Sequence, residues 1–180
     1  AGLFGQDVST YLPYLAVGFI VWQFMASSMN EGSNSMVDAA AIIKQVNVPL
    51  SVHPMRVAMR NFIILLHNVP LIVFFPVFMG VELGLTLIIV PVAFILLFLN
   101  SIWVCVVLGL AGARYRDIQP LTQNLTTILF FFTPILWQPE ILSERAIFVD
   151  LNPFHHFIQI IRMPMLGEWP PFVSVAAVLV

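Results

Sequence analysis

The side chains that could carry out chemistry in this sequence are few, and the most suggestive are two adjacent histidines, His155 and His156, which follow Asp150. Histidine and carboxylate side chains bind transition metals, and histidine also transfers protons. Adjacent residues of a helix, however, point about 100° apart, and no third ligand is evident beside the pair. We therefore predict no metal site. The cluster remains the basis of one alternative interpretation, a membrane-embedded glycosyl- or acyltransferase.

Other signatures of catalysis are missing from the sequence. It contains no GxxxxGK phosphate loop and no HExxH zinc motif. The longest apolar stretches also lack the buried acidic residue that a proton- or sodium-coupled carrier usually needs. We therefore predict that the chain is not an enzyme and binds no cofactor of its own. If it moves a substrate, the energy comes from elsewhere.

The elements that must position the polar side chains are membrane helices. The residues are 60% hydrophobic and 9% charged, whereas about 25% of the residues of a soluble domain are charged. The longest uncharged run, residues 83–113, would form a helix roughly 45 Å long, more than the ~30 Å hydrocarbon core requires. Tilt, a kink at Pro91 or a first turn in the headgroups can absorb the surplus. We predict an all-α integral membrane protein, a polytopic helical bundle.

The uncharged runs predict four complete spans and the beginning of another. The spans cover residues 10–30, 61–81, 86–113 and 118–138, and the last one begins within 170–180. Cytoplasmic loops are enriched in lysine and arginine, so we place on that side the sections that hold five of the seven basic residues, namely Lys44, Arg56, Arg60, Arg114 and Arg116. Both ends look truncated, and residues 1–180 are expected to be a single transmembrane domain of a longer protein.

The polar section at residues 31–60 is expected to hold a short amphipathic helix. Ser35 to Asp38 resembles a capping box, with a hydroxyl and an acid at the start of a helix, which predicts a separate helix from Met36 to Val46. Its apolar residues share one face. The helix should end before Pro49, because the residue before a proline avoids the helical region. Pro54 would open the next helix as its first residue.

Residues 140–168 are predicted to be neither a span nor a plain loop. The pair Asn152 and Pro153 predicts a helix start, because the amide can cap and proline loses nothing in the first turn. The helix that follows has an apolar stripe and a separate polar stripe containing His155 and Arg162. Such a helix either lies flat at the membrane interface or folds back against the bundle. The alternation of spans places it on the external side.

Several short motifs occur in an order that resembles one family. They are GFIVW at 18–22, IIK at 42–44 with VP at 48–49, RYRD at 114–117, TPILW at 133–137, and NP at 152–153 with Arg162 and LG at 166–167. Together they resemble the membrane subunits of type-2 ABC exporters, specifically the permeases for O-antigen, capsule or teichoic-acid polysaccharides. The resemblance covers nearly the whole chain. One departure is Val48, where relatives often carry an aromatic residue before the proline.

The resemblance implies a type-2 ABC transporter fold with six spans in the full-length protein. It implies a homodimeric pore that pairs with two copies of a cytoplasmic ABC ATPase subunit, which binds the ATP and Mg²⁺. The implied substrate is a lipid-linked polysaccharide, which the transporter moves across the cytoplasmic (inner) membrane. The chain itself would be in contact with membrane lipid. Nucleic acid has no implied role. A drug or a lipid is an alternative cargo.

The resemblance also implies roles for particular residues. An ATPase-coupling helix would use Ile42, Ile43, Lys44, Val48 and Pro49. A cytoplasmic turn, Arg114, Tyr115, Arg116 and Asp117, would pair with the cytoplasmic helices and the partner subunit. An external gate within 140–168 would include Asn152, Pro153, His155 and Arg162. Because sugar rings stack on aromatic side chains, the candidates for the substrate path are Tyr14, Trp22, Phe131 and Trp137. Each group also has a purely structural alternative. The coupling helix could be an interfacial helix, the turn a topology anchor, the gate a lid, and the aromatic residues a lipid-facing belt.

Overall fold

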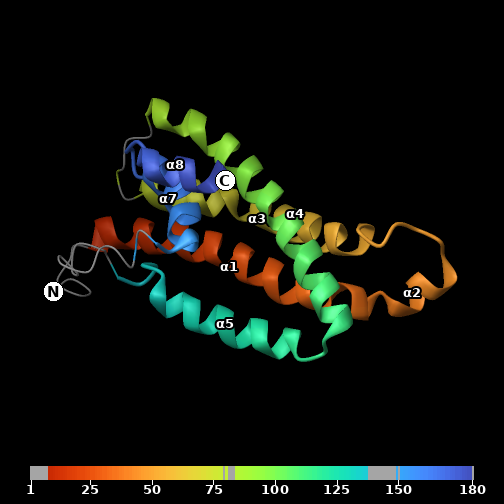
Figure 1. Cartoon of the computed structure of the whole chain (residues 1–180). Coiled ribbons are helices and arrows are strands. Elements are labelled where there is room, and N and C mark those ends of the chain that lie inside the picture. The colour runs from red at the N-terminus through yellow and green to blue at the C-terminus, as the bar shows by residue number, and fades with distance from the viewer. Residues whose placement is uncertain (1–7, 79, 81–83, 138–148, 150, 180) are drawn as a thin grey trace. The chain divides into compact units, whose positions relative to one another are not determined.

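The described residues form helices connected by short turns, and they contain no strand (Figure 1). The computed structural model describes residues 8–78, 80, 84–137, 149 and 151–179. The helices are α1 (Val8–Asp38), α2 (Ala40–Gln45), α3 (Val52–Phe78), the 3₁₀ helix η2 (Leu85–Ile88), α4 (Ile89–Arg114), α5 (Ile118–Phe132), α7 (Pro153–Met165) and α8 (Phe172–Leu179). The predicted all-α fold class is confirmed.

Three helical stretches are long and apolar enough to cross a membrane. Among the described residues they are Tyr11–Gln45, Val52–Phe78 and Leu85–Arg114, and even the 26 residues of α4 would span about 39 Å. The chain is therefore a multi-pass membrane protein. α3 begins well before the predicted start at residue 61, with Pro54 in its first turn, where a missing N–H has no helical partner to lose.

The predicted span at residues 118–138 is helical over only part of its length. α5 has 15 residues, about 22 Å of helix, and it ends at Phe132. Residues 133–137 continue as turns. Residue 138, residues 79 and 81 of the predicted span 61–81, and residue 180 of the last span lie outside the described residues. So do 140–148 and 150 of the predicted gate segment.

The capping box predicted at Ser35–Asp38 is wrong, because no helix begins there. α1 continues through these residues to Asp38, and the amide of Asn34 donates to Asp38 at 2.6 Å within its last turn. α2 follows after Ala39 alone, which makes no side-chain cap. Ser33 and Ser35 are 1% and 3% exposed, so tertiary packing on this part of α1 outweighs the local tendency of serine to start a helix.

The helices divide into two compact units. One unit holds residues 23–66 and 98–129, and the other holds the described parts of 1–22, 67–97 and 130–180. We name them the coupling unit and the gate unit after the predicted coupling and gate residues that they contain. In the coupling unit the later half of α1 approaches α4 very closely. A Cβ added at Gly112 would lie 1.9 Å from the backbone oxygen of Ser33, and one at Gly109 would lie 2.6 Å from Ser35 Oγ. Glycine is therefore required for this contact between the two helices.

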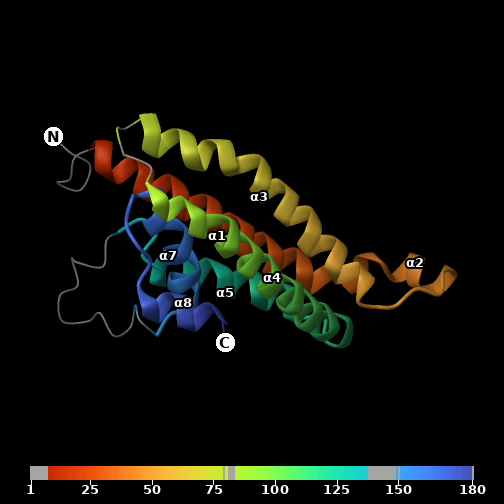
Figure 2. The ribbon, with the colours of Figure 1, turned by 90° about the horizontal axis from the view of Figure 1, so that it is seen from above.

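The gate unit is built around α7, which packs against α8 and η2 (Figure 2). Thr86 of η2 donates to the backbone oxygen of Pro164 at 3.1 Å, and a ring nitrogen of His156 lies 3.0 Å from Ser174 Oγ on α8. The predicted start of α7 is confirmed, since the Asn152 side chain accepts from Phe154 N–H at 3.0 Å ahead of Pro153. Of the two arrangements left open by the sequence, α7 takes the folded-back one, with its polar stripe buried.

Candidate functional site

The predicted coupling residues lie on an exposed part of the coupling unit. α2 has no buried residue, and it lies beyond the last turn of α1, before the chain returns into α3 (Figure 1). Ile42 of α2 is 44% exposed, and Val46, the residue that follows the helix, is 51% exposed. Lys44 and Pro49 are exposed, and Ile43 and Val48 are half-buried. An exposed apolar face of this kind is typical of a surface that another molecule covers.

The predicted cytoplasmic turn is exposed as well. Arg114 is the last residue of α4, and its guanidinium carbon lies 5.8 Å from the centre of the Tyr115 ring. Arg116 and Asp117 are exposed and complete the connection to α5. Within the described part of the chain, none of these three charges forms an ion pair. Pairing of the turn with the predicted cytoplasmic helices and with a partner subunit stays a prediction.

The four aromatic residues predicted to line a substrate path have different surroundings. Tyr14 and Trp22 on α1 are buried, at 8% and 5% exposed. Trp22 packs against Phe130, with ring centres 5.8 Å apart, and against Phe154. Phe131 is 65% exposed, and the Trp137 indole N–H donates to its backbone oxygen at 3.3 Å. The first two therefore act as packing residues within this chain, and their role in a substrate path stays a prediction.

Arg162 of the predicted external gate is fully buried in the gate unit. Its guanidinium carbon lies 3.8 Å from the centre of the Tyr14 ring, and its Nη1 donates to the backbone oxygen of Pro134 at 3.0 Å. Gly18 makes room for it, since a Cβ there would lie 2.1 Å from Nη2. Burial lowers the pKa of Arg162 to about 10, against the opposing effect of Tyr14, so the side chain keeps its charge at neutral pH. It joins α7 to α1 and to the segment after α5.

The other predicted gate residues hold α7 in place. Asn152 caps the helix with its oxygen, and its amide nitrogen donates to Thr133 Oγ1 at 2.9 Å. The Tyr14 hydroxyl in turn donates to the backbone oxygen of Pro134 at 3.1 Å. His155 is buried, with Nε2 3.4 Å from the Gln159 amide nitrogen. Among the described residues, no three histidine, cysteine or acidic side chains come together as a metal site would require.

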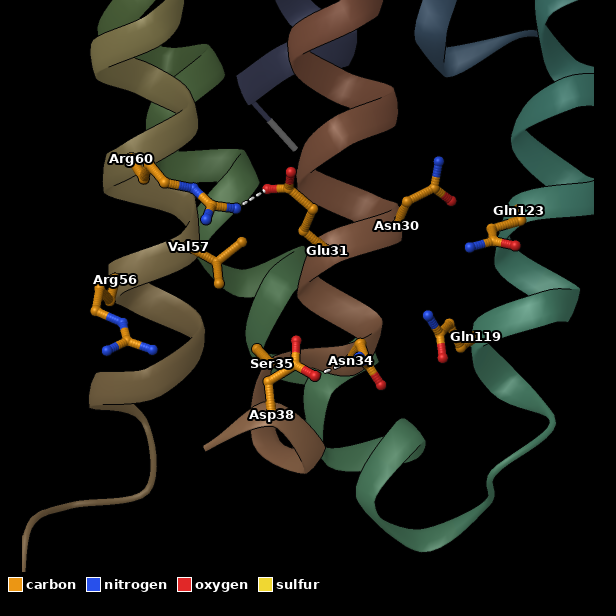
Figure 3. Close-up of a pocket in the computed structure, with 10 residues that line it drawn as sticks. All are labelled: Asn30, Glu31, Asn34, Ser35, Asp38, Arg56, Val57, Arg60, Gln119 and Gln123. Atoms are coloured by element: carbon orange, nitrogen blue, oxygen red, sulfur yellow. Dashed lines mark hydrogen bonds and ion pairs between the residues drawn. The ribbon is translucent and has the colours of Figure 1, made fainter. Parts of the chain in front are cut away.

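The sequence analysis missed a polar cavity of about 380 Å³ in the coupling unit. Three helices line it, each with residues one turn apart. α1 contributes Asn30, Glu31, Asn34, Ser35 and Asp38, α3 contributes Arg56, Val57 and Arg60, and α5 contributes Gln119 and Gln123. Figure 3 shows that the amide groups of the two glutamines point toward α1. We call this site the α1–α3–α5 cavity.

Hydrogen bonds fix part of the cavity wall and leave part of it open. Glu31 accepts from Arg60 Nη2 and, at 2.8 Å, from the amide of Asn61. The Asn30 side-chain oxygen accepts from Thr126 on α5 at 3.3 Å. Among the described residues, the side chains of Arg56, Gln119 and Gln123 make no hydrogen bond. The cavity therefore presents both donors and acceptors that a ligand could use.

A signal for this cavity does exist in the sequence. Asn30, Asn34 and Asp38 recur every four residues, as do Arg56 with Arg60 and Gln119 with Gln123, and residues four apart share one face of a helix. Each polar stripe by itself is also typical of a helix end that lies near the lipid headgroups. Only the tertiary structure brings the three stripes around one space.

Comparison with known proteins shows similarity to a polysaccharide-export permease. No family model matches the chain. Over 151 residues, 82% of the chain, it is 23% identical to the O-antigen export system permease protein RfbA of Myxococcus xanthus, and it spans 58% of that relative's length. The sequence motifs, the all-α membrane fold and this similarity agree with one another. They confirm the resemblance to the polysaccharide-export permeases of the type-2 ABC exporters.

Proposed function

We propose that the chain is part of the permease subunit of an ATP-driven exporter that moves lipid-linked polysaccharide, of the O-antigen, capsule or teichoic-acid type, across the cytoplasmic membrane. The multi-pass helical fold and the similarity to an O-antigen export permease support this proposal. The permease would work as a homodimer with two copies of a cytoplasmic ATPase subunit. ATP hydrolysis would take place on that subunit and not on this chain.

The observation that carries the proposal is the position of α2. A six-residue helix with no buried residue joins two of the long apolar helices, and a single residue, Ala39, separates it from α1. An ATPase that closes on α2 would therefore move α1 with little slack between them. Converting a partner's closure into a shift of packed helices is a known type of conformational coupling.

The gate unit supplies the second element of the mechanism. α7 is held by the buried Arg162 and by the Asn152 cap, so it has a defined resting position on the predicted external side. We propose that it closes the exit until the coupling helix moves. Opening would then require the Arg162 contacts with Tyr14 and Pro134 to rearrange.

The experiment is affinity purification of the full-length protein from its own cells, followed by a search for a bound ATPase subunit. The complex is then compared with the variants Ile43→Glu and Pro49→Asp, and with Gln45→Glu as a control that adds the same charge elsewhere on α2. We expect the first two to lower substrate-stimulated ATPase activity and export at least tenfold with normal membrane insertion. Gln45→Glu should stay close to wild type.

Two results would contradict the proposal. One is recovery of the full-length protein without an ATPase under conditions that preserve known transporter complexes. The other is normal export by both Ile43→Glu and Pro49→Asp, because a coupling surface cannot tolerate a buried carboxylate in place of an apolar contact.

A further inference from the structure

We propose that the α1–α3–α5 cavity binds uncharged sugar units of the exported glycan before translocation. The inference rests on the proposed function and names where this chain would hold its substrate. The cavity lies in the same compact unit as α2 and the 114–117 turn, the two sections assigned to the cytoplasmic side by their basic residues. A ligand in the cavity would therefore arrive from the compartment in which ATP is hydrolysed.

The charges of the cavity favour a neutral ligand. Its lining contains two arginines, Arg56 and Arg60, and two carboxylates, Glu31 and Asp38, so the formal charges cancel. Arg60 is already engaged by Glu31. A site for a phosphate or pyrophosphate group would carry an excess of cationic donors, and a site for a divalent cation would carry an excess of carboxylates. Neither excess is present in this lining.

The remaining lining matches the hydrogen bonding of sugar hydroxyls. Four primary amides, those of Asn30, Asn34, Gln119 and Gln123, line the cavity, and each amide group both donates and accepts. A hydroxyl group has the same dual character. Among the described residues, Gln123 is hydrogen-bonded through its backbone oxygen, and the side-chain amides of Gln119 and Gln123 make no hydrogen bond. These amides would therefore not have to break a contact in order to bind.

The size of the cavity fits a short part of a glycan. At about 380 Å³ it lies at the lower end of the range of small-ligand pockets, about 300–1,000 Å³, which suits one or two sugar rings. No aromatic residue lines it, so hydrogen bonds rather than ring stacking would select the ligand. Val57 provides the one apolar contact in the lining.

The test uses adjacent positions on α5 that differ in whether they line the cavity. In a full-length protein in which Cys105 and every other cysteine are replaced by alanine, a single cysteine is introduced as Gln123→Cys or as Asn124→Cys. Both positions are exposed, but only residue 123 lines the cavity. Labelling by a maleimide is then timed with and without the soluble glycan released from the cell's own lipid-linked polysaccharide. Inorganic pyrophosphate serves as the second probe.

We expect the glycan to slow labelling at residue 123 at least threefold and to leave residue 124 unchanged, whereas pyrophosphate should protect neither. Protection of residue 123 by pyrophosphate alone would overturn the proposal in favour of an anion site. No protection at glycan concentrations that stimulate the ATPase, or equal protection at both positions, would also overturn it.

A second measurement does not depend on labelling. Gln123→Leu keeps the size of the side chain and removes its amide, and Asn124→Leu is the matched control. Loss of one hydrogen bond should raise the glycan KM for ATPase stimulation about three- to tenfold, with kcat and expression unchanged, in Gln123→Leu only. An unchanged KM would contradict the cavity assignment. If the wild-type complex does not respond to glycan at all, the proposed function fails instead, so the two failures are distinguishable.

Discussion

The guanidinium of Arg162 stacks on the ring of Tyr14, with its central carbon 3.8 Å from the ring centre and no exposed surface on the arginine. A cation placed over an aromatic face and removed from water is stabilised by about 2 kcal/mol. The same group donates to the backbone oxygen of Pro134. In the described residues, its Nε and Nη2 have no hydrogen-bond partner, so the stacking contact compensates an incompletely satisfied buried charge.

The variant Gly18→Ala should displace Arg162 and destabilise the gate unit. The added methyl group would lie 2.1 Å from Nη2, and a fully buried guanidinium has no free space to enter. We expect a loss of about 2–4 kcal/mol of stability, from the cation–π contact and a hydrogen bond to a charged group. The measurement is the midpoint of thermal unfolding in detergent. Gly84→Ala is the control, because nothing lies within 4 Å of that position.

A double mutant separates this explanation from a general intolerance of alanine in α1. The Arg162→Met variant has no guanidinium to clash with the added methyl group. In that background Gly18→Ala should therefore lower the stability by less than about 0.5 kcal/mol relative to Arg162→Met alone. If the two effects simply add, the contact between the two residues is not the cause.

The glycines of α4 should differ in whether a second substitution can rescue them. Gly112→Ala places a methyl 1.9 Å from a backbone oxygen, that of Ser33, whereas Gly109→Ala places one 2.6 Å from the side-chain Oγ of Ser35. A side chain can be shortened and a backbone cannot move without separating the helices. We expect both variants to be destabilised, by about 1–3 kcal/mol as is usual for overpacking, with Gly112→Ala the worse.

The rescue experiment adds Ser35→Ala to Gly109→Ala and Ser33→Ala to Gly112→Ala. The first pair should recover part of the thermal midpoint, and the second should recover none. Equal recovery in the two pairs would mean that backbone contact does not set the distance between α1 and α4.

Loss of the Glu31 side chain should destabilise the protein more than loss of the Arg60 side chain with which it pairs. The ion pair with Arg60 is solvent-accessible, with the side chains 43% and 58% exposed, and such pairs contribute about 0–1 kcal/mol. Asn61, in contrast, is 3% exposed and donates to the same carboxylate. Removing that acceptor leaves a buried amide unpaired, which costs about 1–3 kcal/mol.

Chemical denaturation can rank three variants in this cluster. We expect Arg60→Met and Glu31→Gln to stay within about 1 kcal/mol of wild type, since an oxygen still faces Asn61 in both. Glu31→Ala should fall clearly below them. A larger loss for Arg60→Met than for Glu31→Ala would show that the ion pair dominates after all.

Asn152 should be replaceable by aspartate but not by alanine. Its oxygen caps α7, and its nitrogen bonds Thr133 Oγ1. Aspartate keeps the capping oxygen, and the Thr133 hydroxyl can turn to donate to it. Asn152→Ala loses both contacts and should cost about 1–3 kcal/mol. Thermal unfolding of the two variants side by side measures the difference, and similar losses in both would exclude the cap as the main role.

The boundaries of α1 and α5 show where sequence patterns were insufficient. The apolar runs identified the long helices, but the serine and aspartate at 35–38 favoured a helix start that tertiary packing overrides. The uncharged run at 118–138 similarly predicted a full span, whereas α5 ends at Phe132. The absence of charged residues shows that a segment can lie in an apolar environment. It does not show at which residue the helical hydrogen bonds end.

Arg162 and the α1–α3–α5 cavity are the features that the sequence left unresolved. Arg162 was assigned to the external gate, and its spacing placed it on a polar stripe, but not beneath Tyr14 against a glycine on another helix. The residues of the cavity come from three helices separated by many positions. No local spacing encodes such a meeting, because it depends on how the helices pack.

The sequence by itself determined the helical membrane class, the start of α7 at Asn152 and the position of the short segment between two long apolar helices, because hydrophobic run length and capping chemistry act locally. Only the tertiary structure decided that α7 buries its polar stripe, that α2 stays exposed and that three polar stripes enclose one cavity. Those outcomes depend on contacts between residues far apart in the chain, and packing of whole helices sets them.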